Sequence, residues 1–308
     1  RTLSVFLNAH EQWRMERGLD RISPWLVKAA IAAEDQRFRS HRGVDPLAMG
    51  RALIQDAVHL RIISGASTLE MQTVKLAGID SSRPLGKLRQ ILGALRLAAH
   101  ADKDTVLAAY LNAAPYGLNL VGCEAAARRY FGKPAAELTL PEAALLAGLP
   151  KSPARLAPLA HPAAALRRRE YVLRRMRETG AIGQAELEAA LAAPLGTAWH
   201  EFPTEAPHLA MRLRAEIPGG HPLATTLDAD VQSLAIESLR KRLAELYGEA
   251  TGGAVVVLDA TNADVLAQVG SPDFSDSAHA GQFDSSGARR SPGSTLKPFL
   301  YALAIAGN

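Results

Sequence analysis

Helical periodicity repeated over residues 23–193 is the feature that most restricts how this chain folds. Segments rich in alanine and leucine place apolar residues three or four positions apart, and turns containing glycine, proline or asparagine separate them. The first segment begins at Ser23-Pro24, a helix-capping residue followed by proline at the first helical position. Similar patterns predict helices over 46–60, 68–77, 84–101, 103–112, 122–131, 141–149 and 163–179. The sequence therefore predicts an all-helical domain.

The pattern changes after residues 194–222, a stretch with proline and glycine that is expected to be a linker. A short strand is expected next, followed by a helix capped at Asp228 and two strands joined by a turn at 261–263. The last apolar run predicts a further helix. The expected fold is therefore mainly α, with a helical domain over 1–193 and the beginning of an α/β domain over 223–308.

Composition places the chain among ordinary globular proteins. Its 308 residues are 48% apolar and 21% charged, which suits two packed domains and argues against disorder. The formal charge of +4 fits an anionic partner or simply a mildly basic enzyme. Cys123 is the only cysteine, so a disulfide framework or a cysteine-rich metal site within the chain is excluded. The arginines of segment 163–179 are expected to form a solvated face, aided by an acidic membrane surface.

Glu34 is the first candidate catalytic residue. It lies four positions after Ala30 and eight after Leu26, so it continues the apolar face of the first helix. A carboxylate in that position would be partly desolvated, which suits proton transfer. The alternative is a helix-end acid paired with Arg37 or Arg39, and spacing alone favours that interpretation.

The stretch RIISGASTLEMQTVK holds a second group of candidates. Ser67 and Glu70 fit a capping box at the start of a helix. Thr68, Gln72 and Lys75 then fall on one polar face, and a helix N-terminus with hydroxyl, amide and ammonium groups suits phosphate. Further cations near this stretch are Arg51, Arg61, Lys87 and Arg89. The alternative is ordinary surface charge.

Four stretches resemble, in order, the motifs of the peptidoglycan glycosyltransferase domain of class A penicillin-binding proteins: EDQRFRSHRGVD, GASTLEMQTVK, KLRQILGALRLAAHADKDTVLAAYLNAAPYG and AAARRYFGKPAAELTLPEAALLAGLPKSP. The resemblance covers about residues 20–160 and implies a lysozyme-like helical domain. TTLDADVQ, AVVVLDATNADVLAQVGSPDF and RSPGSTLKPF resemble the start of the transpeptidase domain in the same proteins. KLRQ and RSPGSTLKPFLYALA look closest to the penicillin-binding protein 1C subgroup. The implied architecture is a glycosyltransferase domain, a linker and an incomplete α/β transpeptidase domain.

The resemblance implies polymerisation of lipid II into β-1,4 glycan strands with release of undecaprenyl pyrophosphate. Glu34 matches the catalytic glutamate, the general base on the 4-hydroxyl of the acceptor sugar. Lys75, Arg51 and Arg61 match positions near the pyrophosphate. The full set of substrate-binding residues that the resemblance and the pattern indicate is Asp35, Phe38, His41, Arg51, Arg61, Ser67, Thr68, Gln72, Lys75, Lys87 and Gln90.

Two positions depart from the family pattern. Gln90 stands where most of the family has a second glutamate, and an amide can bind substrate but cannot act as an anionic base. The 1C subgroup shares this glutamine. Glu70 stands where threonine is usual, and it either replaces the lost charge or completes the capping box; the capping box is the favoured interpretation.

Ser294 and Lys297 form Ser-x-x-Lys at the start of the last predicted helix. A desolvated, neutral lysine one turn away could activate the serine as an acyl-transfer nucleophile. The resemblance implies that Ser294 would attack a stem peptide or a β-lactam. The chain ends eleven residues after Lys297, before the later motifs of that domain, so transpeptidase activity and penicillin binding are expected to need the complete domain.

Three other functions stay open: a lysozyme-like glycan-cleaving enzyme, a non-catalytic module that binds lipid II or glycan, and a basic nucleic-acid-binding domain. The cations of 51–75 favour polymerisation, because a glycan-cleaving enzyme has no pyrophosphate to hold. No recognition motif supports nucleic acid. The expected partners are lipid II, the growing glycan and a membrane surface, at the periplasmic face of a bacterial inner membrane. No metal-ligand cluster is evident and no cofactor is certain; a divalent cation, Mg or Mn, at the pyrophosphate stays open.

Overall fold

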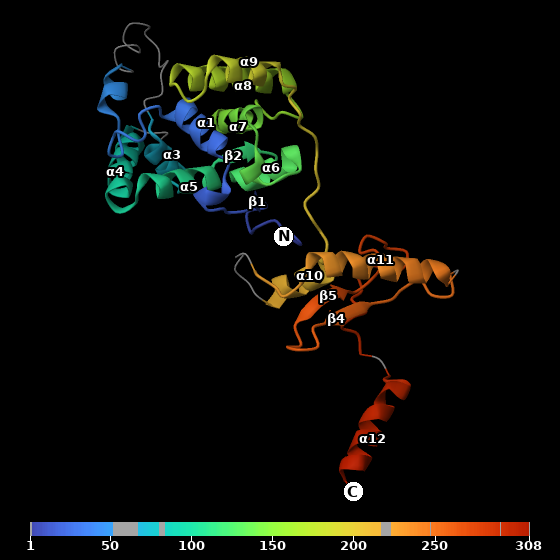
Figure 1. The fold of residues 1–308 in the computed structure, drawn as a ribbon. Helices are drawn as coiled ribbons and strands as arrows, with labels where there is room; N and C mark the ends of the chain where they lie inside the picture. Colours follow the sequence, from blue (N-terminus) through green and yellow to red (C-terminus); the bar gives the residue numbers. More distant parts are fainter. Residues whose placement is uncertain are drawn as a thin grey trace. The chain divides into compact units, whose positions relative to one another are not determined.

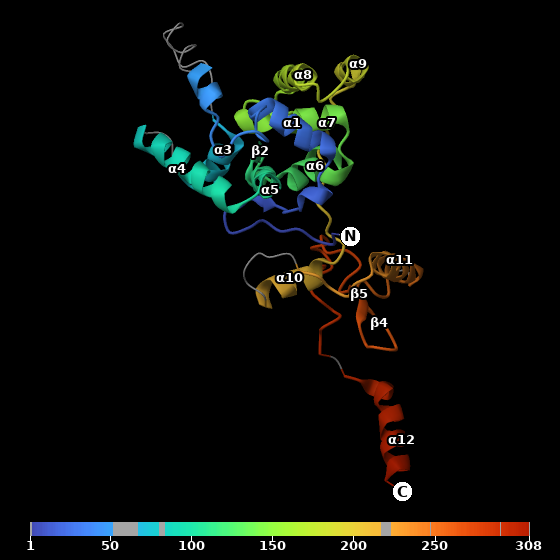
Figure 2. The same ribbon diagram turned by 60° about the vertical axis from the view of Figure 1, so that its left-hand side comes forward.

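The computed structural model describes residues 2–51, 67–79, 84–216, 223–246, 248–289 and 291–307. Two compact units are present (Figures 1 and 2). Residues Phe6–Phe202 form the first, and residues 2–5 with the described part of 203–307 form the second. Most of the helix predicted over 46–60 lies outside the described residues, as does Arg61. Among the residues that are described, no helix is both long and apolar enough to cross a membrane.

The first unit is built mainly from helices. In chain order they are α1 (Pro24–Glu34), α3 (Leu69–Leu76), α4 (Pro84–His100), α5 (Lys103–Ala113), α6 (Cys123–Phe131), α7 (Leu140–Gly148), α8 (Pro162–Glu178) and α9 (Gln184–Ala192), with 3-10 turns η1 (Leu19–Arg21), η2 (Ala135–Glu137) and η3 (Leu149–Lys151). The predicted helices from 68–77 to 163–179 are confirmed, each within one residue at either end. Helix α9 completes the predicted helical region.

Capping residues explain where these helices begin and end. Ser23 accepts a hydrogen bond from the backbone N–H of Trp25 at 3.3 Å, and Asp102 accepts one from Thr105 at 2.7 Å. Gly132 ends α6 in the left-handed conformation, with φ of 68°, which costs a glycine little. Local chemistry therefore fixes the boundaries that periodicity only outlines.

Helix α7 lies at the centre of the first unit. It packs against α1 and α8, and α1 also packs against α8, while α3 packs against α4 and α5 (Figure 1). The stretch 143–148 of α7 is buried throughout. Because this stretch of α7 is apolar on all sides, it can pack against both α1 and α8 and keep them close together. The C-terminal end of α1 consequently meets residues from α3 and α8.

A small sheet corrects the prediction of an all-helical domain. Its strands lie in the order β1 (Trp13–Arg14), β3 (Leu120–Val121), β2 (Pro115–Gly117), with β1 parallel and β2 antiparallel to β3. Leu118 and Asn119 form the turn between β2 and β3, and both have positive φ, 51° and 58°. Strands of two or three residues are too short to give the alternating pattern from which strands are predicted.

The second unit contains α10 (Pro207–Glu216), α11 (Ala229–Glu245), β4 (Val255–Leu258), β5 (Val265–Val269), η4 (Gly293–Leu296) and α12 (Lys297–Ala306). Helix α11 packs on the antiparallel β4–β5 hairpin. The Asp228 cap and the hairpin with its turn at 261–263 are confirmed. The short strand expected after residue 222 is not formed at 223–228, and α10 lies within the predicted linker.

Candidate active site

Glu34 is the last residue of α1 and lies where side chains of three helices meet. Gln72 of α3 donates its amide N–H to Glu34 Oε2 at 2.6 Å. The guanidinium of Arg168, from α8, lies 3.8 Å from Glu34 Oε1. The side chains of Glu34 and Arg168 are 15% and 10% exposed. The carboxylate is thus largely buried between an amide and a cation, yet still reaches solvent.

Glu34 ends its helix, but its expected pairing with Arg37 or Arg39 is wrong, because these two arginines bind other carboxylates. Arg37 lies 3.6 Å from Asp45, and Arg39 lies 2.6 Å from Asp104. The arginine that contacts Glu34 comes instead from a helix more than a hundred positions later in the chain.

Arg168 is a site residue that the sequence analysis missed, since the arginines of this helix were expected to be solvated. Its Nε donates to the carbonyl of Gly148 at 3.2 Å, and its guanidinium lies 4.6 Å from the centre of the Tyr171 ring. The signal was available: Arg168 lies three positions after Ala165 and four before Val172, and both of these residues are completely buried.

The residues that follow Glu34 are buried and connect α1 to α3. Asp35 Oδ2 accepts a hydrogen bond from the backbone N–H of Leu69 at 3.1 Å and lies 2.8 Å from His41 Nε2. Phe38 is completely buried. Burial raises the pKa of Asp35, although the hydrogen bond from Leu69 and the contact with His41 oppose this rise. These side chains form a buried network directly after Glu34 in the chain.

Two tyrosine hydroxyls are buried within reach of the charge on Glu34. Tyr110 of α5 and Tyr116 of β2 are 2% and 0% exposed, and neither hydroxyl has a hydrogen-bond partner among the described residues. Burial raises the pKa of both well above the ordinary value, and the charge of Glu34 raises each further. Both tyrosines are therefore neutral and give Glu34 a low-dielectric surrounding.

Helix α3 begins differently from the prediction. Thr68, not Ser67, is its N-cap: its hydroxyl accepts from the N–H of Met71 at 3.2 Å and donates to the carbonyl of Gly43 at 2.6 Å. Thr68 is buried, so it lies off the polar face predicted for it. The predicted capping box is wrong, because Glu70 is completely buried and pairs with a different helix.

Lys75 and Lys87 bring two cations together beside α3. Lys87 donates its ammonium N–H to the hydroxyl of Ser67 at 2.8 Å. Burial lowers the pKa of Lys87, and the neighbouring ammonium of Lys75 lowers it further. An anion beside these two groups would relieve their repulsion. Arg51 is exposed at the end of a described segment, and Arg61 lies outside the described residues.

Gln90 of α4 is turned into the protein. Its side chain is almost completely buried, and its amide donates to the carbonyl of Ile79 at 3.0 Å. The amide thus fastens the turn that follows α3. Glu34 is bonded by Gln72 instead, so the two glutamines have different tasks.

Ser294 lies in η4 and Lys297 is the first residue of α12. Their spacing is that of neighbours on one helical turn. Both are exposed, so the described residues do not provide the desolvation that a neutral lysine requires.

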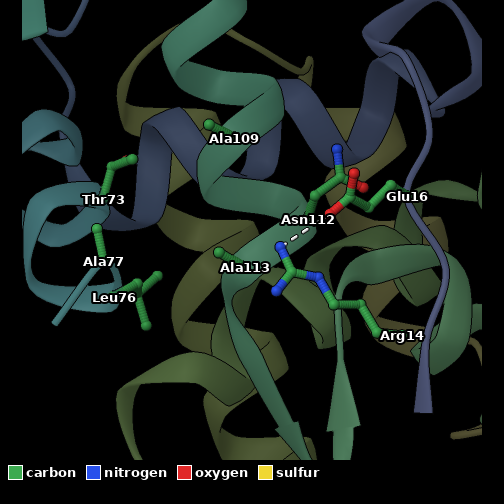
Figure 3. Close-up of a pocket in the computed structure, with 8 residues that line it drawn as sticks. All are labelled: Arg14, Glu16, Thr73, Leu76, Ala77, Ala109, Asn112 and Ala113. Carbon is green, nitrogen blue, oxygen red and sulfur yellow. Dashed lines mark ion pairs between the residues drawn. The ribbon is translucent and has the colours of Figure 1, made fainter. Parts of the chain in front are cut away.

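A separate hollow of about 380 Å³ lies beside α3, α5 and the β1 segment (Figure 3). The residues that line it are Arg14, Glu16, Thr73, Leu76, Ala77, Ala109, Asn112 and Ala113. Arg14 and Glu16 form an ion pair of 2.9 Å on this lining. None of the candidate site residues lines this hollow, so it is distinct from the surroundings of Glu34.

Comparison with known proteins assigns the class. A family model described as transglycosylase matches residues 2–177, more than half of the chain, and the chain therefore belongs to that family. A model described as the penicillin-binding protein transpeptidase domain matches residues 253–308. A transglycosylase domain followed by a transpeptidase domain is the order found in class A penicillin-binding proteins, and the predicted class is confirmed.

The similar proteins are of the same kind. Penicillin-binding protein 1C of Escherichia coli is 37% identical over 300 residues, which are 97% of this chain and 39% of the relative. Penicillin-binding protein 1A of Pseudomonas aeruginosa is 36% identical over 230 residues, 71% of this chain and 28% of the relative. The chain thus spans about two fifths or less of these relatives. A solved structure of penicillin-binding protein 1A from Haemophilus influenzae covers 80% of this chain and 29% of its own, with 24% identity and a TM-score of 0.38, and adds nothing to the assignment.

Proposed function

We propose that this chain polymerises lipid II into β-1,4 glycan strands and releases undecaprenyl pyrophosphate, as part of a class A penicillin-binding protein. The observation that carries the proposal is the placement of Glu34. Its largely buried carboxylate is held by Gln72 and Arg168, and α3, which supplies Gln72, also supplies one of two neighbouring cations, Lys75 and Lys87. Helix α3 thus contacts the base through Gln72 and contributes Lys75 to the proposed anion site.

The proposed reaction is an inverting displacement. Glu34 takes the proton of the acceptor sugar's 4-hydroxyl while that oxygen forms a bond to the anomeric carbon of the growing chain. The bond from this carbon to the pyrophosphate oxygen breaks on the opposite face, and the electron pair leaves with the pyrophosphate. The leaving group needs cationic stabilisation more than protonation, and Lys75 and Lys87 would supply it.

The glycan-cleaving alternative is less well supported. Most glycosidases need two carboxyl groups, one on each side of the scissile bond, and at least one of these must deliver a proton to the leaving sugar. Among the described residues, the carboxyl groups of Asp35, which follows Glu34, and of Glu70, on α3, are buried and already bonded to His41 and Lys103. The site therefore suits a reaction that needs one base.

For the complete protein we propose transpeptidation, with Ser294 as the acyl nucleophile and Lys297 as the group that activates it. Stem peptides and β-lactams would bind once the rest of that domain covers these two residues. The proposed partners of the helical domain are lipid II, the growing glycan and a membrane surface at the periplasmic face. We also propose that a divalent cation can bind at the pyrophosphate. The proposed domain division is a glycosyltransferase domain at 1–193, a linker at 194–222 and the first part of the transpeptidase domain at 223–308.

Labelled lipid II in a membrane-like detergent tests the polymerisation. Wild-type protein should form long glycan, and Glu34→Gln should reduce the rate by about a hundredfold or more, since general acid–base catalysis contributes roughly 10²–10⁴-fold. Glu142→Gln is the matched control, because Glu142 is a half-buried glutamate of α7 paired with Lys133 at 2.7 Å, and it should polymerise normally. Shortening of preformed glycan would indicate the cleaving enzyme, and binding without turnover would indicate a lipid II module.

A further inference from the structure

Glu70 is a buried carboxylate that the proposed reaction does not use directly. It lies in the first turn of α3 and is 0% exposed. Its Oε1 lies 2.5 Å from the ammonium of Lys103, the first residue of α5. Its Oε2 is buried and has no hydrogen-bond partner within the part of the chain that the structure describes. Burying a carboxylate costs free energy, so its position calls for a reason.

Lys103 connects Glu70 to the segment that follows Glu34. Its ammonium lies 4.4 Å from the centre of the Phe38 ring, so it makes a cation–π contact as well as the ion pair. Phe38 is itself completely buried. One ammonium group therefore joins the start of α3, the start of α5 and the segment 35–41.

Glu70 also lies against the Asp35–His41 pair. One oxygen of each carboxylate and one ring nitrogen of His41 all lie within 4.8 Å of one another. Asp35 binds the N–H of Leu69, the residue next to Glu70, so the same few atoms join α1 to α3. Burial raises the pKa of Asp35, and the charge of Glu70 adds to the rise, so the two carboxylates influence each other.

The carboxylate that lies beside the Asp35–His41 pair is therefore at position 70, whereas position 90 carries an amide. Gln90 is committed to the carbonyl of Ile79. Glu70 instead pairs with Lys103 and holds its ammonium over the ring of Phe38. This contact restrains the segment immediately after Glu34. An ion pair whose members are fixed by a second contact holds its geometry more tightly than a pair at the surface.

We propose that Glu70, acting through Lys103, is a positioning residue for glycosyl transfer: the pair fixes the segment 35–41 and with it the direction of the Glu34 carboxylate. This role rests on the proposed function, in which Glu34 is the base. It gives the departure from the family pattern at position 70 a task that the capping box does not explain.

The donor set of Asp35, His41 and Glu70 also has the spacing of a metal site. Lys103 already places a positive charge on Glu70, and the Asp35–His41 contact occupies one nitrogen of the ring. The Lys103 ammonium thus neutralises Glu70, as a divalent ion would. We therefore expect that Mn²⁺ does not bind at this cluster and does not stabilise the protein through it.

Steady-state kinetics on lipid II, together with thermal unfolding, test the positioning role. Glu70→Gln and Lys103→Met should each lower kcat by about ten- to a hundredfold, the scale expected for a base displaced by about 1 Å, with KM changed by less than about threefold. Lys103→Arg keeps the charge and the ring contact and should retain most of kcat. The control Glu142→Gln removes a comparable ion pair, with Lys133, and should lower the unfolding temperature without lowering kcat.

A normal kcat for folded Glu70→Gln would overturn the proposal, as would an equal loss in Glu142→Gln. If Glu70→Gln does not fold, the double variant with Lys103→Met removes both charges; it should fold and be slow, and full activity would refute the role. Thermal stabilisation of the wild type by Mn²⁺ that Glu70→Gln abolishes would assign the cluster to a metal instead. Glu34→Gln separates the two proposals: if it still polymerises, the function with Glu34 as base fails, whatever Glu70 does.

Discussion

Replacement of Arg129 should destabilise the helical unit more than any surface arginine does. Arg129, in α6, is 2% exposed, and its guanidinium carbon lies 4.1 Å and 4.2 Å from the ring centres of Trp199 and Phe202. Its NH1 also donates to the carbonyl of His200 at 2.7 Å. Together these contacts fasten the end of the helical unit to α6.

The magnitude follows from the contacts that Arg129→Met removes. A hydrogen bond from a charged donor is worth about 1.5–3 kcal/mol, and a desolvated cation–π contact about 1–2 kcal/mol. Methionine keeps part of the packing, so we expect a loss of about 3–4 kcal/mol. For a unit of this size each kcal/mol shifts Tm by about 2–4 °C, so the fall should be about 6–16 °C.

Tryptophan fluorescence during thermal and urea unfolding is the assay. All three tryptophans, Trp13, Trp25 and Trp199, belong to Phe6–Phe202, so the signal follows this unit alone. The control is Arg174→Met, because Arg174 is exposed and its pair with Glu170 at 2.6 Å should be worth about 0.3–0.5 kcal/mol. A loss in Arg129→Met within about 1 kcal/mol of the control would refute the reasoning.

Three further predictions concern pH and close packing. Because burial and a neighbouring ammonium lower the pKa of Lys87, polymerisation should decline at a lower alkaline pH than an ordinary lysine would allow, and Lys87→Arg should extend the active range upward in a pH–rate profile. Burial raises the pKa of Glu142, but hydrogen bonds from Lys133 and Thr139 outweigh burial, so the pKa is lowered overall. The ionised Glu142 therefore stabilises the folded protein above about pH 4.5, and this contribution to the free energy of unfolding is lost as the pH falls through the lowered pKa. In acid titrations of unfolding, Glu142→Gln should show a smaller loss of stability over this range. Gly43→Ala would place a Cβ 2.6 Å from the carbonyl oxygen of Ala94 at a φ of +91°, so Tm should fall by several degrees; an unchanged Tm would contradict the geometry.

Helix positions could be predicted from the sequence because periodicity and caps are local. Ser23 and Asp228 mark the starts of their helices, because each side chain accepts a hydrogen bond from a backbone N–H only two or three residues later. The N-cap role of Thr68 was harder to predict, because Ser67 and Glu70 have the spacing of a capping box and fit the local sequence equally well. Only the bond from Thr68 to the distant Gly43 explains the choice.

The site could be predicted only in part, since its decisive contacts join distant segments. Gln72 and Lys75 were proposed because they share one helix face, whereas Glu34 was proposed chiefly through the family resemblance, since spacing alone favoured a helix-end acid. The contact of Arg168 with Glu34, and that of Lys103 with Glu70, depend on how α8 and α5 pack, which no short pattern encodes. A charged residue beside a buried helical face is the kind of signal that could find them.

The turn between β2 and β3 is a place where substitutions should raise the thermal stability of the protein. Leu118 has a φ of 51°, a left-handed conformation that costs a side chain other than glycine about 1–2 kcal/mol. An Asn-Gly pair suits a two-residue turn with both φ values positive, so Leu118→Asn with Asn119→Gly should recover part of that cost. Neither residue is among those assigned to the site. Such a thermostabilised background would keep fragile variants, Arg129→Met among them, folded long enough for their kinetics to be compared.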